Sequence, residues 1–228
     1  MKKIIILMFL VPSVNLFSQE PQIDKDVKDY AYVSKDGPNR KDFGHFYFGL
    51  GCMTGNPTDS GKIIPVASFN FISGYRYKRK ISNCYALGYD ISYNLKNYGI
   101  LQDTLKVFPN KITHDKEKLV NNNFEFEVFN RINIGKRGDI LGFYIDFGPY
   151  FDYIFSARFK TYEYAENEKT VFKDLDYTNW FEYGIKARIG IDRYILFASW
   201  RLSDMFVKKY NYPELSRLII GLQIGLFK

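Results

Sequence analysis

The chain of 228 residues predicts an all-β fold: an eight-stranded antiparallel up-and-down transmembrane β-barrel whose lumen is filled by polar side chains. Three observations predict this fold. Apolar and polar residues alternate with a period of two through eight segments, and the connections between the segments are alternately long and short. A short apolar run of the secretory type begins the chain.

The final segment, residues 217–228, shows the alternation most simply. Its even positions are all aliphatic, namely Leu218, Ile220, Leu222, Ile224 and Leu226. Its odd positions are mixed and often small, so the two faces of this strand meet different environments. A long terminal strand with a free edge invites aggregation. Pairing with the first predicted strand removes that edge, which indicates a closed barrel.

The start of the chain predicts export. Lys2 and Lys3 precede an apolar run at residues 4–11 that is too short to span a bilayer, and Ser18 is a small residue at a plausible cleavage point. An N-terminal anchor is the alternative, but no second half of a span follows. We predict a signal peptide at residues 1–18, a flexible periplasmic tail at 19–42 and the barrel domain at 43–228.

The charge balance favours lipid over nucleic acid as a partner. The chain has 32 basic and 25 acidic residues, and loss of Lys2 and Lys3 leaves 30 against 25, a net charge of +5. This excess could suit anionic headgroups, but it forms no basic stripe of the kind that reads nucleic acid.

Eight strands follow from the alternation. They are predicted at residues 43–52, 63–77, 84–96, 119–134, 141–155, 177–191, 194–203 and 217–228. An even count with alternating loop lengths is typical of outer-membrane barrels and places both termini in the periplasm. Cys52 and Cys84 would then lie at opposite rims, too far apart for a disulfide, so both should be free thiols.

Volume decides which face of the barrel is outside. The apolar face carries mostly Phe, Tyr, Ile and Leu, which would overfill an eight-stranded lumen. The other face has room because it is rich in glycine: Gly49, Gly51, Gly74, Gly88, Gly142, Gly148, Gly184, Gly190, Gly221 and Gly225. We therefore expect the bulky face to meet lipid and the polar face to fill the lumen.

The predicted lumen contains equal numbers of acids and bases. The acids are Asp90, Glu125, Glu127, Asp146, Asp152 and Glu182, and the bases are Arg76, Arg131, Lys186, Arg188, Arg201 and Arg217. Buried charges are tolerated when they are paired. We expect Glu182 to lie level with Arg201, and Glu127 or Arg131 to lie near Asp146. The result would be a lumen plugged by ion pairs instead of an open pore.

Three segments carry a resemblance to a known family. Residues 142–151, Phe181–Gly184 and the terminal Leu226-Phe227-Lys228 resemble the PorT-like small outer-membrane β-barrel proteins of Bacteroidota and, more distantly, the OmpA transmembrane domain and OmpX. The resemblance covers about residues 43–228. It implies a chain recognised by the barrel-assembly machinery through its last strand, where Phe227 is penultimate. It also suggests, by analogy, a role beside a protein-secretion machine.

The leading hypothesis is a non-enzymatic integral outer-membrane barrel with a structural, adhesive or accessory role in an envelope complex. Its partners would be outer-membrane lipid (lipopolysaccharide and phospholipid), the barrel-assembly machinery and an envelope complex. A narrow transport or ligand-binding barrel is the alternative, and a lipid-modifying enzyme is a third possibility.

Candidate chemistry is sparse in the sequence. We assign no catalytic, cofactor-binding or metal residues, because His45 and His114 should lie on opposite sides of the membrane. We interpret His114 as a solvated loop residue. Loop lysines that could meet lipopolysaccharide phosphates are interpreted in the same way: Lys106, Lys111, Lys116, Lys118, Lys208 and Lys209.

Overall fold

The computed structural model describes residues 37–54, 63–104, 106–135, 138 and 140–227. The predicted signal peptide, and the predicted tail as far as residue 36, lie outside the described residues. Within the described part of the chain, no helix is both long and apolar enough to cross a membrane.

Nine antiparallel strands make up the described fold, and eight of them form a closed ring. The strands are β1 (Asp42–Met53), β2 (Phe69–Lys80), β3 (Tyr85–Ile100), β4 (Lys116–Ile134), β5 (Phe143–Glu163), β6 (Glu168–Lys173), β7 (Phe181–Ile191), β8 (Tyr194–Arg201) and β9 (Leu218–Leu226). Each ring strand pairs with its neighbours in chain order, except that β7 follows β5 because β6 pairs with β5 alone. The predicted fold class is confirmed.

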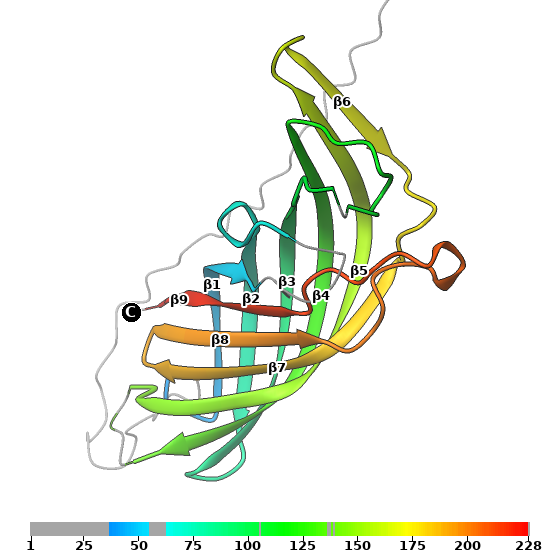
Figure 1. Cartoon of the computed structure of the whole chain (residues 1–228). Helices are drawn as coiled ribbons and strands as arrows, with labels where there is room; N and C mark the ends of the chain where they lie inside the picture. The colour runs from blue at the N-terminus through cyan, green and yellow to red at the C-terminus, as the bar shows by residue number, and fades with distance from the viewer. Residues whose placement is uncertain (1–36, 55–62, 105, 136–137, 139, 228) are drawn as a thin grey trace, which may run out of the picture. The chain divides into compact units, whose positions relative to one another are not determined.

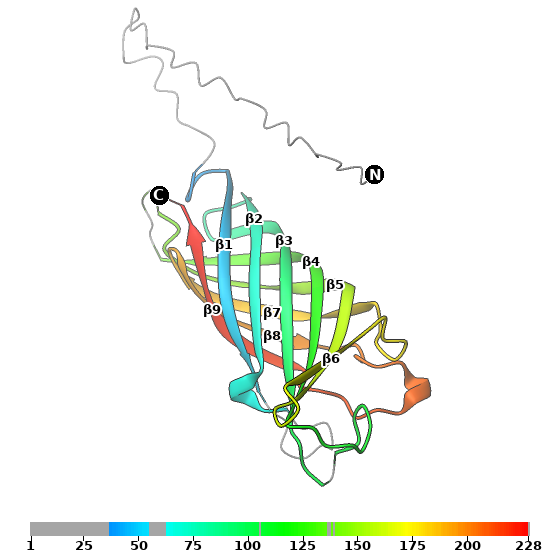
Figure 2. The ribbon, with the colours of Figure 1, turned by 90° about the horizontal axis from the view of Figure 1, so that it is seen from above.

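Closure occurs where the last strand meets the first. β9 pairs with β1 from Phe46–Leu226 to Met53–Ile219, and Figure 2 shows the red β9 beside the blue β1. Short turns and both ends of the ring lie at one end of the barrel, called the turn end. The longer connections after β1, β3, β5 and β8 lie at the other, called the loop end. The free edge that the sequence predicted for the last strand is therefore paired.

The second strand is shorter at its start than predicted. β2 begins at Phe69, because Pro65 starts a single 3-10 turn over Pro65–Ala67 and cannot donate a ladder hydrogen bond. Ile63 keeps only an isolated bridge to Ile100. At its other end β2 continues to Lys80, three residues beyond the predicted end at residue 77.

The strands predicted at residues 141–155 and 177–191 left the residues between them as a long loop, and this prediction is wrong. β5 continues to Glu163, turns and returns as β6, while β3 and β4 also extend beyond their predicted bounds. The β4–β5 register shifts between Asn122 and Asn123, which marks a β-bulge. Beyond it, residues 116–122, 156–163 and 168–173 form a three-stranded sheet that projects from the loop end (Figure 1); we call it the extension.

The two faces of the barrel wall match the volume argument. Outward side chains are exposed, such as Phe46 at 64% and Leu222 at 65%, whereas the inward Phe129 and Tyr144 are 0% exposed. Inward rings rest on glycines of neighbouring strands. A Cβ at Gly88 would lie 2.3 Å from the Phe129 ring. Large and small residues therefore share the narrow lumen.

The two cysteines lie at opposite ends of the barrel. Cys52 pairs with Phe69 and Ile220 at the loop end, whereas Cys84 directly precedes β3 at the turn end. Both thiols are free and exposed.

The outward position of Leu222 can be tested with a charge. Leu222 lies in the middle of β9 between Leu50 and Leu196. We expect Leu222→Arg to lower the free energy of unfolding in lipid vesicles by about 2–4 kcal/mol, because the charge enters hydrocarbon. Val66→Arg is the control, since Val66 is 98% exposed outside the ring. Equal stabilities of the two variants would contradict the outward orientation.

Candidate functional site

Twelve charged side chains in the interior of the ring are joined by ion pairs, and we call them the lumen network. They are Arg76, Asp90, Lys96, Glu125, Glu127, Arg131, Asp146, Asp152, Glu182, Lys186, Arg188 and Arg201, and none is more than 4% exposed. Strand alternation directs them inward, and the register sets them in rows. Arg76, Asp90 and Glu127 are cross-strand neighbours on β2, β3 and β4. Arg131, Asp146 and Arg188 are neighbours on β4, β5 and β7.

The Arg131–Asp146 pair lies in the half of the lumen nearer the turn end. Arg131 donates from Nε to Asp146 Oδ1 at 2.7 Å and from Nη2 to Oδ2 at 2.8 Å, a bidentate arrangement. The guanidinium also lies 3.8 Å from the centre of the Tyr144 ring. Both partners are fully buried, so neither charge has solvent as an alternative.

Side chains from six strands contact one another in the middle of the lumen. Arg76 Nε donates to Asp90 Oδ2 at 2.8 Å, and Arg76 Nη2 donates to Gln223 Oε1 at 2.8 Å. Tyr47 donates its hydroxyl to Asp90 at 2.7 Å. Arg188 lies 3.5 Å from Asp90 and donates to Glu127, which brings in β7 and β4.

Lys186 completes this central group. Its ammonium donates to Glu125 and lies 3.7 Å from Glu127. Ser92 donates to Glu125 at 3.4 Å from the opposite side. Glu125 and Glu127 of β4 are thus both compensated by bases from β7.

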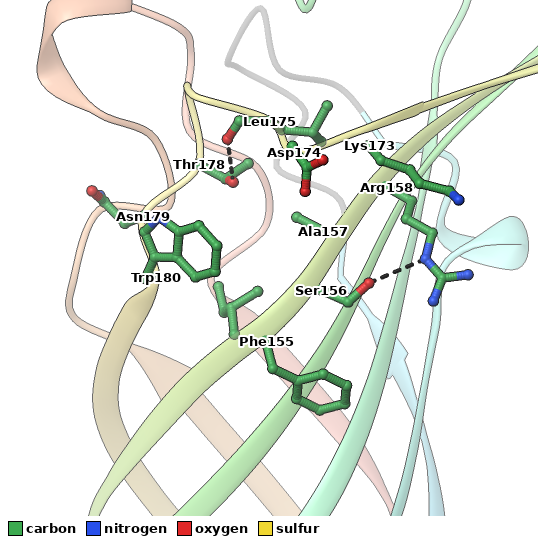
Figure 3. Close-up of a pocket in the computed structure, with 11 residues that line it drawn as sticks. Phe155, Ser156, Ala157, Arg158, Lys173, Asp174, Leu175, Thr178, Asn179 and Trp180 are labelled. Carbon is green, nitrogen blue, oxygen red and sulfur yellow. Dashed lines mark hydrogen bonds between the residues drawn. The ribbon is translucent and has the colours of Figure 1, made fainter. Parts of the chain in front are cut away.

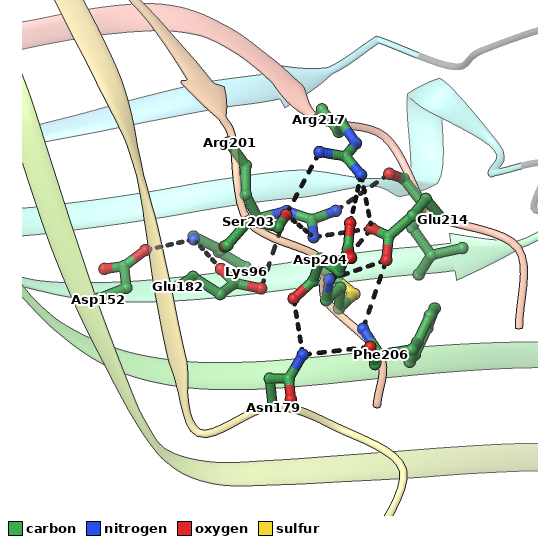
Figure 4. Close-up of polar contacts among 12 residues, drawn as sticks. Lys96, Asp152, Asn179, Glu182, Arg201, Ser203, Asp204, Phe206, Glu214 and Arg217 are labelled. Atoms are coloured by element: carbon green, nitrogen blue, oxygen red, sulfur yellow. Dashed lines mark hydrogen bonds and ion pairs between the residues drawn. The ribbon is translucent and has the colours of Figure 1, made fainter. Parts of the chain in front are cut away.

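The loop-end half of the network is centred on Lys96. Its ammonium donates to Asp152 at 2.5 Å and to Glu182 at 2.9 Å. Arg201 lies 3.8 Å from Glu182 and pairs with Glu214 at 2.9 Å, so the chain of charges continues to the rim (Figure 4). The structure therefore places Glu182 close to Arg201, at a longer distance than its contact with Lys96.

Arg217 was predicted to face the lumen but lies at the rim of the loop end. It is 30% exposed at the loop-end rim, where it donates to Asp204 at 2.8 Å and lies 3.9 Å from Glu214. The prediction was wrong because Arg217 precedes β9, which begins at Leu218. Lys96, which was not among the predicted lumen bases, is buried in the lumen instead. The lumen network keeps six acids and six bases.

Apolar clusters close the lumen above and below the charges. The loop-end plug consists of Met53, Ile63, Tyr98, Ile100, Phe108, Leu119, Phe159, Leu175, Phe197, Met205, Phe206, Leu215 and Ile219. The turn-end cap consists of Phe43, Leu141, Tyr144 and Ile195, with Phe227 packed against it. The described interior is thus a charged layer between two apolar layers.

The two histidines lie at opposite ends of the fold. His45 is 3% exposed and stacks on Phe43 at 5.1 Å near the turn end. The interpretation of His114 as solvated was wrong: it is half-buried and contacts Glu163 and Glu117 beside Lys106. Among the described residues, no group of three or more His, Cys, Asp or Glu side chains is arranged to hold a metal ion.

Comparison with known proteins yields one family. A family model described as an outer membrane protein beta-barrel domain matches residues 17–206, which is 190 of the 228 positions. No curated protein matches the chain.

The Arg131–Asp146 pair offers a test of the lumen network. We expect Arg131→Met to destabilise the barrel by about 3 kcal/mol or more, because it strips Asp146 of its bidentate partner. The double variant Arg131→Met, Asp146→Leu should be more stable than the single one. Unfolding in detergent micelles, followed by heat-dependent gel mobility, measures both.

Arg217→Met is the matched control, since the same substitution at the exposed rim should cost at most about 1 kcal/mol. Similar losses for Arg131→Met and Arg217→Met, or additive losses in the double variant, would contradict a coupled buried pair.

Proposed function

The chain belongs to the family of outer membrane protein β-barrel domains, and we propose that it is a non-enzymatic barrel with a structural, adhesive or accessory role in an envelope complex. The ring of eight strands and the outward apolar face support insertion into the outer membrane. Both termini of the ring lie at the turn end, which we assign to the periplasm. The loop end then faces outward from the cell.

The sealed lumen is the observation that carries this proposal. Conduction requires a continuous polar path, but the loop-end plug and the turn-end cap place buried apolar side chains across both ends. Between them, every lumen acid lies within 4 Å of a lumen base. A narrow transport role is therefore disfavoured, and the working surfaces are the loops and the outer wall.

The resemblance to PorT-like proteins supports an accessory role beside a secretion or assembly machine. Phe227 packs within the turn-end cap, in addition to any role as a signal for the barrel-assembly machinery. Its ring packs edge-on against Phe43 at 5.3 Å and against His45 at 5.0 Å. Assembly of the last strand and closure of the turn-end cap thus involve the same aromatic residue.

Ligand binding at the loop end is a second candidate function. A pocket of about 520 Å³ lies between the inner face of the extension and the loops, and Phe159, Phe172, Tyr177, Tyr210 and Tyr212 line it. This volume and an aromatic lining with a few polar groups are typical of small-molecule sites. Flat aromatic faces beside hydroxyl and carboxylate groups suit a sugar ring.

Two measurements test the leading role. In planar bilayers, we expect the purified barrel to give no stable open current, because its lumen is plugged. Affinity purification from detergent-solubilised outer membrane should recover stoichiometric envelope proteins. A stable current would overturn the sealed-lumen proposal, and recovery of the barrel alone would count against an accessory subunit.

The loop-end pocket has its own test on a glycan array. If the pocket binds sugars, Tyr212→Ala should reduce binding at least about tenfold, because loss of a stacking aromatic removes a large contact surface. Tyr164→Ala is the control, since Tyr164 is 66% exposed at the tip of the extension and does not line the pocket. If the unaltered protein bound no glycan on the array, sugar binding at the loop-end pocket would be rejected.

A further inference from the structure

The extension has two faces of opposite character. Leu119 and Phe159 on its inner face join the loop-end plug, and the acids Glu117 and Glu163 point to the same side, where they contact His114. The other face points away from the barrel. Its charged side chains are all cations, and we call them the basic face: Lys116, Lys118, Arg158, Lys160, Lys169 and Lys173.

Cross-strand pairing brings these cations together. Lys118 pairs with Lys160 between β4 and β5, and Arg158 pairs with Lys173 between β5 and β6. Like charges directly opposite each other destabilise a sheet. No acidic residue occupies the outward positions of these strand segments, which are otherwise Val120, Asn122, Ser156, Tyr162 and Val171. The basic face therefore lacks an internal counter-charge.

Burial and the neighbouring cations together lower the pKa values of two lysines on the basic face. Beyond Tyr153, β5 has left the ring, so these groups lie outside the membrane-spanning segments. Burial lowers the pKa of Lys118, and the nearby ammonium groups of Lys116 and Lys160 lower it further. Burial also lowers the pKa of Lys160, with Lys169 and Arg158 adding to the effect. An external anion would reduce the repulsion between these neighbouring cations.

The basic face lies directly above an aromatic part of the outer wall. Where β5 and β7 separate, a pocket of about 250 Å³ opens in the wall, and Phe155, Trp180, Arg158 and Lys173 are among its lining residues. Figure 3 shows Arg158 and Lys173 side by side on one flank, with Phe155 nearer the barrel body. Trp180 is 58% exposed and Phe155 is 40% exposed. One carboxylate, Asp174, also lines this pocket.

This arrangement matches an amphiphile with an anionic head. Exposed aromatic rings at the end of a lipid-facing wall are typical of the membrane interface, and cations just beyond them meet headgroups. The cations occupy three strands, which spans about 10 Å across the sheet at the usual strand spacing. That width exceeds a single phosphate and suits a headgroup with more than one.

We propose that the basic face and the pocket below it bind lipid A, the phosphorylated anchor of lipopolysaccharide in the outer leaflet. This inference rests on the proposed function, because it requires the loop end to face outward. Arg158 and Lys173 pair with a phosphate at the wall, and Lys118 and Lys160 lie one row further out. Phe155 and Trp180 contact the start of an acyl chain.

The test uses two triple variants with equal charge loss. Arg158→Gln, Lys160→Gln, Lys173→Gln alters the basic face. Lys111→Gln, Lys208→Gln, Lys209→Gln alters exposed loop cations elsewhere. Each full-length protein is purified from outer membranes in detergent and titrated with fluorescent bis-phosphorylated lipid A. Dephosphorylated lipid A and phosphatidylglycerol are the competing probes.

We expect the basic-face variant to bind lipid A about tenfold or more weakly, and the loop variant to bind like the unaltered protein. Equal affinity of all three proteins, or no binding by the unaltered protein, would overturn the proposal. Equal competition by phosphatidylglycerol would overturn the assignment to lipid A, and equal competition by dephosphorylated lipid A would overturn the role of the phosphates.

Membrane fractionation separates this inference from the function on which it rests. Recovery of all variants in the outer membrane with normal heat-dependent mobility, but without a difference in lipid A affinity, rejects the binding site alone. Failure of the unaltered protein to fractionate with the outer membrane rejects the proposed function as well.

Discussion

Charge pairing inside a closed ring is the constraint on which the rest of the structure depends. Eight strands enclose a space just wide enough for side chains, and the twelve charged side chains of the lumen network within it are at most 4% exposed. Each acid must therefore find a base on another strand. Glycines such as Gly88 and Gly184 provide room beside the Phe129 and Tyr150 rings. With the lumen filled, the protein can meet other molecules only through its wall and its loops.

The barrel was predictable from the sequence because two environments alternate along each strand. Leu222 and Gln223 are neighbours in the chain, yet one is 65% and the other 1% exposed. Ring closure, the outward apolar face and most of the lumen charges follow from that alternation. The Arg131–Asp146 contact was predictable as well, because β4 and β5 are consecutive antiparallel strands with a short predicted connection, which limits the residues that can face each other.

The errors occur where alternation no longer separates apolar from polar residues. In the extension, Lys116-Glu117-Lys118 alternates between two polar environments, so a hydrophobic pattern does not reveal the strand. Lys96 was missed because the predicted strand ended there, although it has the same parity as the inward Asn94. Arg217 shares the parity of the lumen residues but precedes its strand, where the chain can turn it towards Asp204. Strand pairing outside the membrane depends on contacts between segments that are far apart in the chain, and the residue pattern of one segment does not reveal them.

The lumen charges also specify how the strands align. The outward residues of β5, such as Ile145 and Phe147, are interchangeable in lipid, so apolar patterning alone would tolerate a slip of two residues between β4 and β5. Such a slip would place Tyr144 or Gly148 opposite Arg131 and leave Asp146 without its bidentate partner. Because breaking a buried pair costs far more than the pair contributes relative to apolar packing, the network discriminates between registers more than it adds stability. The charges that fill the lumen therefore select one strand register among those that an apolar outer face alone would allow.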